Sequence, residues 1–123
     1  MSARILYCLT RDHDLARALD DRLAGAIAFF YNDAARLHQA VTLRAPDVVL
    51  VDTGAVRAEY GDAGLGPVAD FLRHRAPRAR LAVRPGEDSV RHLVAAEAGP
   101  GVEIFPTELG ACVEAVAAAC GRT

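Results

Sequence analysis

The chain has 123 residues, of which 52% are hydrophobic and 24% are charged, and its formal net charge is −2. This length is typical of one domain, and the balance of apolar and charged residues is that of a soluble globular protein. No apolar run approaches the roughly 20 residues that a membrane span requires, and the weak net charge gives little support to nucleic-acid binding. We therefore expect one domain over residues 1–123, with no membrane partner and no direct nucleic-acid partner.

The first residues and the amino-acid composition indicate the location of the protein and exclude some kinds of site. Residues 1–4 lead directly into a strand-like run, without the apolar region and cleavage site of a secretory signal, so a cytoplasmic location is expected. The three cysteines, Cys8, Cys112 and Cys120, are odd in number and lack metal-ligand spacing, which argues against a disulfide framework or a zinc site. All 14 basic residues are arginine. Any mechanism that needs a lysine is excluded.

The first half of the chain alternates between strand and helix patterns. Residues 4–9 form a short, nearly continuous apolar run, typical of a strand that is covered on both faces. A helical stripe follows from Leu15 to about Gly25, then a strand over residues 26–31 and a second helical stripe over residues 34–43. Residues 47–52 contain four successive apolar residues between two aspartates, which predicts the central strand.

The second half repeats the alternation after an irregular stretch. Residues 55–66 contain three glycines and no firm period, which indicates a loop or an irregular helical turn. Helices are predicted from Pro67 to about residue 76, over 90–98 and over 107–119, with short strands at 80–84 and 102–105. His13, His38, His74 and His92 have polar neighbours and no ligand spacing, so we expect all of them on solvated faces.

This element order predicts an α/β fold. Five strands alternate with helices, and the connections are too long for hairpins, so right-handed crossovers place helices on both faces of a parallel sheet. The expected architecture is the flavodoxin-like (CheY-like), doubly wound, five-stranded parallel sheet with strand order 2-1-3-4-5.

Ligands of such sheets bind at the carboxyl ends of the strands, so the residues that end each strand are the candidate site. The first turn contains no glycine through which the backbone could approach a phosphate, which argues against nucleotide binding. Cys8 lacks the downstream arginine of a phosphatase loop and is expected to be a buried thiol. Asp52 is the strongest candidate, because an apolar strand that delivers a carboxylate to the rim of the sheet must solvate it, pair it or use it.

These elements and the run Asp47 to Asp52 after Ala45-Pro46 resemble the receiver domains of response regulators, the phosphorylated modules of bacterial two-component signalling. The run resembles the family's third strand, which ends in the aspartate that accepts the phosphoryl group, and the resemblance covers nearly the whole chain. It implies that Asp52 occupies the phosphoacceptor position and that Phe105-Pro106 occupies the position of the family's Lys-Pro pair.

The departures from that family pattern decide the functional expectation. A working receiver needs two acids at the end of the first strand to bind Mg²⁺. Here these positions align with Leu9 and Thr10, or with Thr10 and Arg11, and offering Asp12 requires an extra residue in the loop. The family's switch Ser or Thr is replaced by Arg84 and its lysine by Phe105. We therefore expect a degenerate receiver, or pseudo-receiver, which is not an enzyme, has no catalytic residues, no metal site and no cofactor, and has little affinity for Mg²⁺.

Arg84 suggests a physical replacement for the missing groups. The fourth strand is expected beside the third, so the Arg84 guanidinium could reach the Asp52 carboxylate and form a charge-assisted pair, which could be bidentate. Such a pair would neutralise the pocket without metal or phosphate and hold one conformation.

The resemblance also implies that the domain works through protein association. The family docks or dimerises through its fourth helix, last strand and last helix, so the expected partner is another signalling protein or a second copy of the chain. The residues expected at this surface are Val90, Leu93, Val94, Ile104, Cys112 and Val116.

Two other functions remain open on the sequence. One is a receiver that is still phosphorylated at Asp52, with Asp12 or Asp14 as metal ligand. The other is a small ligand carrier or enzyme on the same fold, such as a flavin or cobalamin binder, although the first loop lacks the phosphate-binding residues of the one and the Asp-x-His-x-x-Gly motif of the other.

Overall fold

The computed structural model describes residues 4–121. They form a five-stranded parallel sheet with the order β2-β1-β3-β4-β5, as the sequence predicts. The strands are β1 (Ile5–Leu9), β2 (Ile27–Tyr31), β3 (Val48–Asp52), β4 (Arg80–Arg84) and β5 (Val102–Ile104). The helices are α1 (His13–Arg22), α2 (Ala34–Leu43), α3 (Thr53–Tyr60), α4 (Leu65–Arg75), α5 (Arg91–Ala98) and α6 (Leu109–Gly121). No helix within residues 4–121 is long and apolar enough to cross a membrane.

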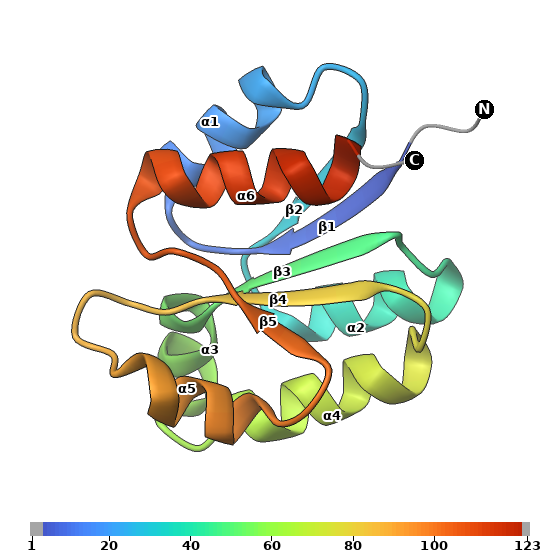
Figure 1. The fold of residues 1–123 in the computed structure, drawn as a ribbon. Coiled ribbons are helices and arrows are strands. Elements are labelled where there is room, and N and C mark those ends of the chain that lie inside the picture. The colour runs from blue at the N-terminus through green and yellow to red at the C-terminus, as the bar shows by residue number, and fades with distance from the viewer. Residues whose placement is uncertain (1–3, 122–123) are drawn as a thin grey trace.

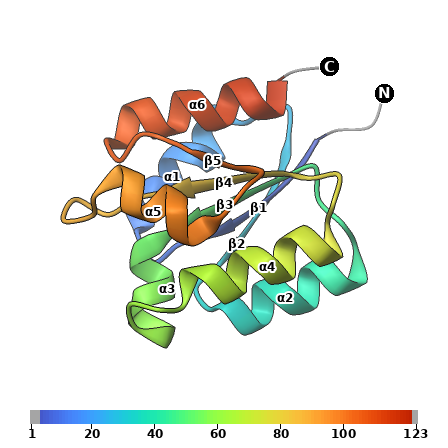
Figure 2. The same cartoon turned by 60° about the horizontal axis from the view of Figure 1, so that its bottom comes forward.

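The helices form a layer on each face of the sheet (Figure 1). One face is covered by α1 and α6, whose apolar side chains join Leu6, Cys8 and Leu50 in one core. The opposite face is covered by α2, α3, α4 and α5, with α2 and α4 packed side by side (Figure 2). The central strands β1 and β3 are buried on both faces, which explains their continuous apolar runs.

Residues 53–60 form a regular α-helix, where the sequence predicted a loop or an irregular helical turn over residues 55–66. The Asp52 carboxylate caps this helix at the Gly54 N–H, while Ala55 and Val56 are buried against the sheet. Gly61, with a φ of 75°, then ends the helix in a backbone conformation that other residues rarely adopt. Of the glycines that suggested a loop, Gly61 ends α3, Gly64 is the N-cap of α4 and Gly66 lies in its first turn, so tertiary burial outweighs the weak local pattern.

Helix α4 begins at Leu65, two residues before the predicted Pro67, and the ends of α1 and α6 also differ from the prediction. Helix α1 ends at Arg22, before Gly25, because Leu23 turns inward and becomes part of the core. Helix α6 begins at Leu109, since the carboxylate of Glu108 accepts hydrogen bonds from the N–H groups of Gly110 and Ala111. Both boundaries are set by contacts that lie outside the local hydrophobic period.

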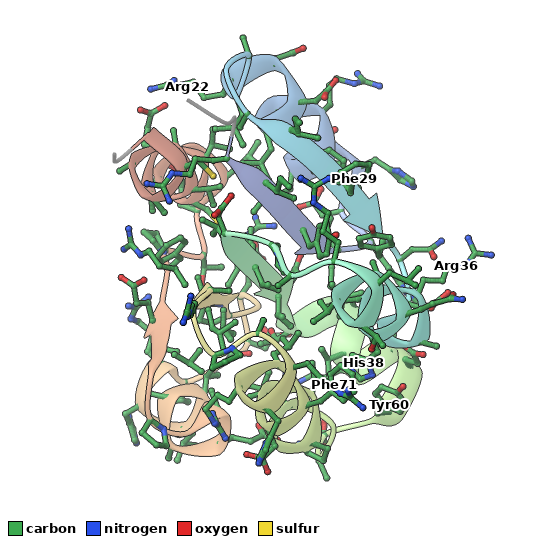
Figure 3. The ribbon with its side chains drawn as sticks, turned by 90° about the vertical axis from the view of Figure 1, so that its right-hand side faces the viewer. Arg22, Phe29, Arg36, His38, Tyr60 and Phe71 are labelled. Carbon is green, nitrogen blue, oxygen red and sulfur yellow. The ribbon has the colours of Figure 1, made fainter. Side chains whose placement is uncertain are left out.

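The environment of His38 differs from the solvated one expected from the sequence. The His38 ring stacks on Phe71 of α4, with the ring centroids 4.0 Å apart, and its Nε2 atom is buried without a hydrogen-bond partner among the described residues. Figure 3 shows the two rings together near Tyr60. Desolvation lowers the pKa of His38, so a neutral imidazole is favoured in the α2–α4 contact.

Candidate functional site

Three neighbouring strands bring polar residues together at the carboxyl edge of the sheet. In the parallel register Leu9 of β1 lies beside Val51 of β3, which puts Thr10 at the level of Asp52. Asp52 in turn is the direct partner of Arg84 at the end of β4. The sheet therefore places a hydroxyl, a carboxylate and a guanidinium side by side, at the edge where ligands bind in open α/β sheets.

Asp52 is a buried carboxylate, and its hydrogen bonds are made within the chain. Only 8% of the residue is exposed. Its Oδ2 accepts a hydrogen bond from Thr10 Oγ1 at 2.9 Å and one from Arg84 Nη1 at 3.4 Å. Its Oδ1 accepts from the Gly54 N–H at 3.4 Å, which caps α3. Both carboxylate oxygens are thus bound by protein donors, as a buried charge requires.

Arg84 connects three segments that are distant in sequence. Its Nη1 donates to Asp12 Oδ2 at 2.9 Å as well as to Asp52, and its Nε donates to the Thr107 carbonyl at 2.9 Å. Burial alone would lower the pKa of Arg84, but the hydrogen bond to Asp12 and the charge of Asp52 raise it above its ordinary value. Arg84 therefore holds its positive charge between the two aspartates.

The Arg84–Asp52 contact expected from the sequence is present, with one correction to its geometry. The guanidinium does not form a bidentate pair with Asp52; one nitrogen is shared with Asp12, which makes the shorter contact. In the family alignment Asp12 reaches the pocket only with an extra residue in the loop, and in the structure it does lie in the pocket. Helix α1 begins at His13 with Asp12 as its N-cap, and this turn points the second carboxylate oxygen back to Arg84.

Asp12 combines a structural and an electrostatic role. Its Oδ1 accepts hydrogen bonds from the N–H groups of Asp14 and Leu15, and its Oδ2 accepts from Arg84. The hydrogen bond from Arg84 lowers the pKa of Asp12, although partial burial acts in the opposite direction. The pocket therefore brings the side chains of Asp12 and Asp52 to one guanidinium.

The donor set of this pocket does not fit the magnesium ion that receiver folds commonly bind. The position that the resemblance aligns with a metal-binding acid carries Thr10, whose hydroxyl donates to Asp52. The two remaining carboxylates share the Arg84 guanidinium, so a divalent cation would compete with a cation already held there. No cluster of three or more His, Cys, Asp or Glu side chains suited to a metal occurs within residues 4–121.

Other residues predicted at the pocket lie outside it. Leu9 is fully buried in the core beneath α2, because the last residue of β1 points to that face. Arg11 is exposed and donates from Nε to the Asn32 carbonyl at 3.0 Å. Phe105 is buried in the opposite core with α1 and α6, and Pro106 beside it is half-buried. The position that the resemblance assigns to the family's lysine is therefore filled by packing.

Two further residues belong to this edge of the sheet: Thr53, which the sequence places at a strand end without assigning it a role, and Thr107, which the sequence does not indicate. Thr53 is buried, and its Oγ1 accepts a hydrogen bond from the Gly86 N–H at 2.9 Å, which ties the start of α3 to the loop after β4. The signal was its place directly after Asp52 at a strand end, where a polar side chain must meet the next loop. Thr107 was missed, because it contributes a main-chain carbonyl that side-chain chemistry does not reveal.

The predicted docking surface is partly wrong. Val90 and Leu93 are exposed, at 47% and 59%, and Ile104 is half-buried. Val94, Cys112 and Val116 are buried and belong to the core, so they are not available to a partner. The helical period explains the difference, because α5 turns Val94 and Ala98 toward the sheet while Val90 and Leu93 face outward.

The three cysteines are free thiols and are all buried. Burial raises the pKa of Cys8 well above its ordinary value and raises that of Cys112 to about 11. Their thiolates are thus disfavoured, and they are inert core residues, as predicted for Cys8.

No family model matches the chain, and no curated protein matches it. Several solved structures do match it. The structure of NtrX from Brucella abortus in complex with ADP is 15% identical with a TM-score of 0.69, and the match covers 98% of this chain but 26% of that one. A response regulator from Hahella chejuensis is 13% identical over 97% of this chain and 93% of its own, with a TM-score of 0.69.

This chain has the receiver fold. It is also similar to a putative pilus assembly protein, CpaE, from Burkholderia thailandensis, with 22% identity, a TM-score of 0.64, and coverage of 98% of this chain and 100% of that one. At these identities the likeness shows the fold, and the chemistry of the site has to be argued from its own residues.

Proposed function

We propose that this chain is a receiver-like signalling domain whose acceptor pocket is closed by Arg84 and which acts by binding another protein. The observation that carries the proposal is the single Arg84 nitrogen shared by Asp12 and Asp52. In this arrangement an internal cation occupies the charge-balancing role that magnesium has in a phosphorylated receiver. The pocket is then neutralised without a ligand, and the domain is held in one state.

The same geometry argues against phosphotransfer. A phosphoryl group on Asp52 would need an accessible Oδ atom, a metal ion and a cation to balance its charge. Here Asp52 is buried, Thr10 replaces a metal-binding acid, and the place of the lysine is taken by the buried Phe105. We propose no catalytic role for any residue of the pocket.

The surface offered to a partner is the exposed side of α5 with β5 and α6. Val90 and Leu93 present apolar side chains there, and Arg91 at the start of α5 donates to the carbonyls of Ile104 and Phe105, which fixes the helix to β5. Association with a signalling protein should therefore depend on Leu93. Leu93→Asp should abolish capture of a partner, while Leu43→Asp, which changes an exposed leucine on α2, should not.

One observation favours a second candidate, a receiver that is still phosphorylated. Asp12 and Asp52 lie on the same guanidinium nitrogen, so two carboxylates do converge as in a metal-binding receiver pocket. If Arg84 moved away, Asp12 and Asp52 would face each other, and their charge would favour a divalent cation.

Amide NMR titrations with Mg²⁺ and then with beryllofluoride, a phosphoryl mimic, separate the two candidates. For the closed pocket, the signals of Asp52, Thr53 and Arg84 should not shift in millimolar Mg²⁺, and the mimic should have no effect. The Arg84→Ala variant should gain Mg²⁺-dependent shifts around Asp12 and Asp52. Shifts in the wild type that vanish in Asp52→Asn would instead establish the phosphorylated switch.

A further inference from the structure

The two edges of the sheet are protected to different degrees. Strand β5 is only three residues long, and Glu103 at its centre forms an ion pair with Arg80, with 2.8 Å between Arg80 Nη2 and Glu103 Oε1. Strand β2 is five residues long, and residues 25–31 contain no charged residue and no proline. Natural sheets usually protect an edge by short length, charge, proline or a bulge. Edge β2 has none of these protections.

Apolar side chains of this edge are exposed. Ile27 and Phe29 are each 46% exposed, although both lie on the face that α2 covers. Figure 3 shows Phe29 on the side of the molecule where β2 forms the edge. The Phe29 ring meets Tyr7 edge-on at a centroid distance of 5.8 Å, which holds it against the sheet.

The main chain of β2 has free hydrogen-bonding groups on its outer side. Ile27 donates its N–H to the Arg4 carbonyl, and the Tyr31 carbonyl accepts from the Thr10 N–H, so these residues face β1. In a parallel ladder alternate residues face the neighbouring strand, so Phe29 also faces β1 while Ala28 and Phe30 point outward. Because β2 is the last strand on its side of the sheet, the N–H and C=O groups of Ala28 and Phe30 have no ladder partner within residues 4–121.

We propose that a second copy of this chain pairs with β2 in an antiparallel manner, about a two-fold axis at Phe29. In this register Ala28 of each copy lies opposite Phe30 of the other, and each of these pairs exchanges both hydrogen bonds. All the outward main-chain groups of Ala28 and Phe30 are then used, and the two five-stranded sheets become one.

The side chains are compatible with the same register. Phe29 meets its own copy in the non-hydrogen-bonded pair, where side chains approach most closely, and Ile27 lies opposite Tyr31. No like charges are placed opposite each other, since the segment is uncharged, and the net charge of −2 gives little repulsion between copies. An isologous contact of this kind closes after two chains. It also leaves the exposed side of α5 free, so it adds to the proposed function.

The Ala28→Pro variant tests the backbone pairing directly. Proline removes the outward N–H of residue 28 but leaves the hydrogen bonds of Ile27 and Phe29 to β1, so the fold should be retained while the edge is blocked. Sedimentation velocity from micromolar to submillimolar protein should give the mass of two chains for the wild type and of one chain for the variant. Phe29→Lys should have the same effect, and it decides the question if Ala28→Pro fails to fold.

Cysteine crosslinking tests the register. The two copies of residue 29 should lie about 4.5 Å apart at Cα, which is close enough for a disulfide. Phe29→Cys should therefore give a disulfide-linked dimer under mild oxidation, and Leu43→Cys, at an exposed position on α2, should not. The native thiols are buried and should not interfere.

Three results would overturn the proposal. The first is a wild-type chain that stays monomeric over the whole concentration range. The second is a dimer that survives both Ala28→Pro and Phe29→Lys, which would place the contact elsewhere. The third is a dimer that these variants abolish but that Phe29→Cys does not crosslink, which would exclude the antiparallel register.

Discussion

Asp52 and Arg84 are direct partners in the register of β3 and β4, and each is the last residue of its strand. Their charges therefore meet at a point that the sheet itself determines, with 3.4 Å between Arg84 Nη1 and Asp52 Oδ2. Because the backbones hold both residues in place, the pair needs little additional ordering, unlike an ion pair between mobile surface side chains.

Removal of Arg84 should destabilise the fold more than neutralisation of Asp52. Arg84→Met leaves the buried Asp52 carboxylate close to Asp12 without a cation, and we expect a loss of about 3 kcal/mol in the free energy of unfolding, as for a broken buried pair. In the double variant with Asp52→Asn the losses should be less than additive, by about 1–2 kcal/mol. Urea unfolding of the wild type and the three variants measures this coupling. Additive losses would show that the two side chains do not interact.

The Thr10 hydroxyl should contribute to the stability of the fold, because it is buried and makes two hydrogen bonds. It donates to Asp52 Oδ2 at 2.9 Å and accepts from the Asp12 N–H at 3.0 Å, so Thr10→Val leaves two polar groups unsatisfied. We expect a loss of about 1–3 kcal/mol in the free energy of unfolding. Thr10→Ser should restore most of it. Thr42→Val, which removes an exposed hydroxyl bonded to the His38 carbonyl, is the matched control and should have a small effect.

His38 should make stability depend on pH below its ordinary pKa of 6.5. Desolvation lowers the pKa of His38 in the folded state, although the charge of Glu59 acts in the opposite direction. Because the pKa of His38 is lower in the folded chain than in the unfolded chain, the contribution of neutral His38 to stability is fully present above pH 6.5. It is lost as the pH falls through the pKa of the folded state. The midpoint temperature of thermal unfolding should differ less between pH 7.5 and pH 5.5 for His38→Phe than for the wild type. His92→Gln, on the exposed side of α5, should leave the difference unchanged.

Gly64 should not tolerate a side chain. A Cβ atom there would lie 2.6 Å from Tyr60 Cβ and 2.9 Å from Val56 Cγ1, at the turn between α3 and α4. Gly64→Ala should therefore force these helices apart and lower the free energy of unfolding by about 1–3 kcal/mol, as overpacking does. Gly25→Ala, where nothing lies within 4 Å of the added carbon, is the control. Equal stability of both variants would contradict the close α3–α4 contact.

The periodicity of the sequence is enough to predict the alternation of strands and helices along the chain and the parallel arrangement of the strands; the strand order follows from the flavodoxin-like architecture that this alternation indicates. Asp47 to Asp52 is an apolar run that only a strand covered on both faces can bury, and the helical stripes on either side require crossovers. The same run delivers Asp52 to the carboxyl edge of the sheet, so the position of this carboxylate follows from the sequence alone. The absence of lysine and the presence of Arg84 at the end of the next strand are equally visible in the sequence.

Only the tertiary structure decided which side chains share the pocket and which edge of the sheet is open. Asp12 reaches Arg84 because the turn into α1 directs its second oxygen across the sheet, and a shift of one residue in that loop would replace it. Val94, Cys112 and Val116 are core residues because their side of each helix packs on the sheet. The local sequence does not show which side that is. Sequence periodicity shows which positions along one helix or strand recur on its buried face. The contacts between elements depend on how the twisted sheet and its helices pack, and that packing is a property of the whole chain.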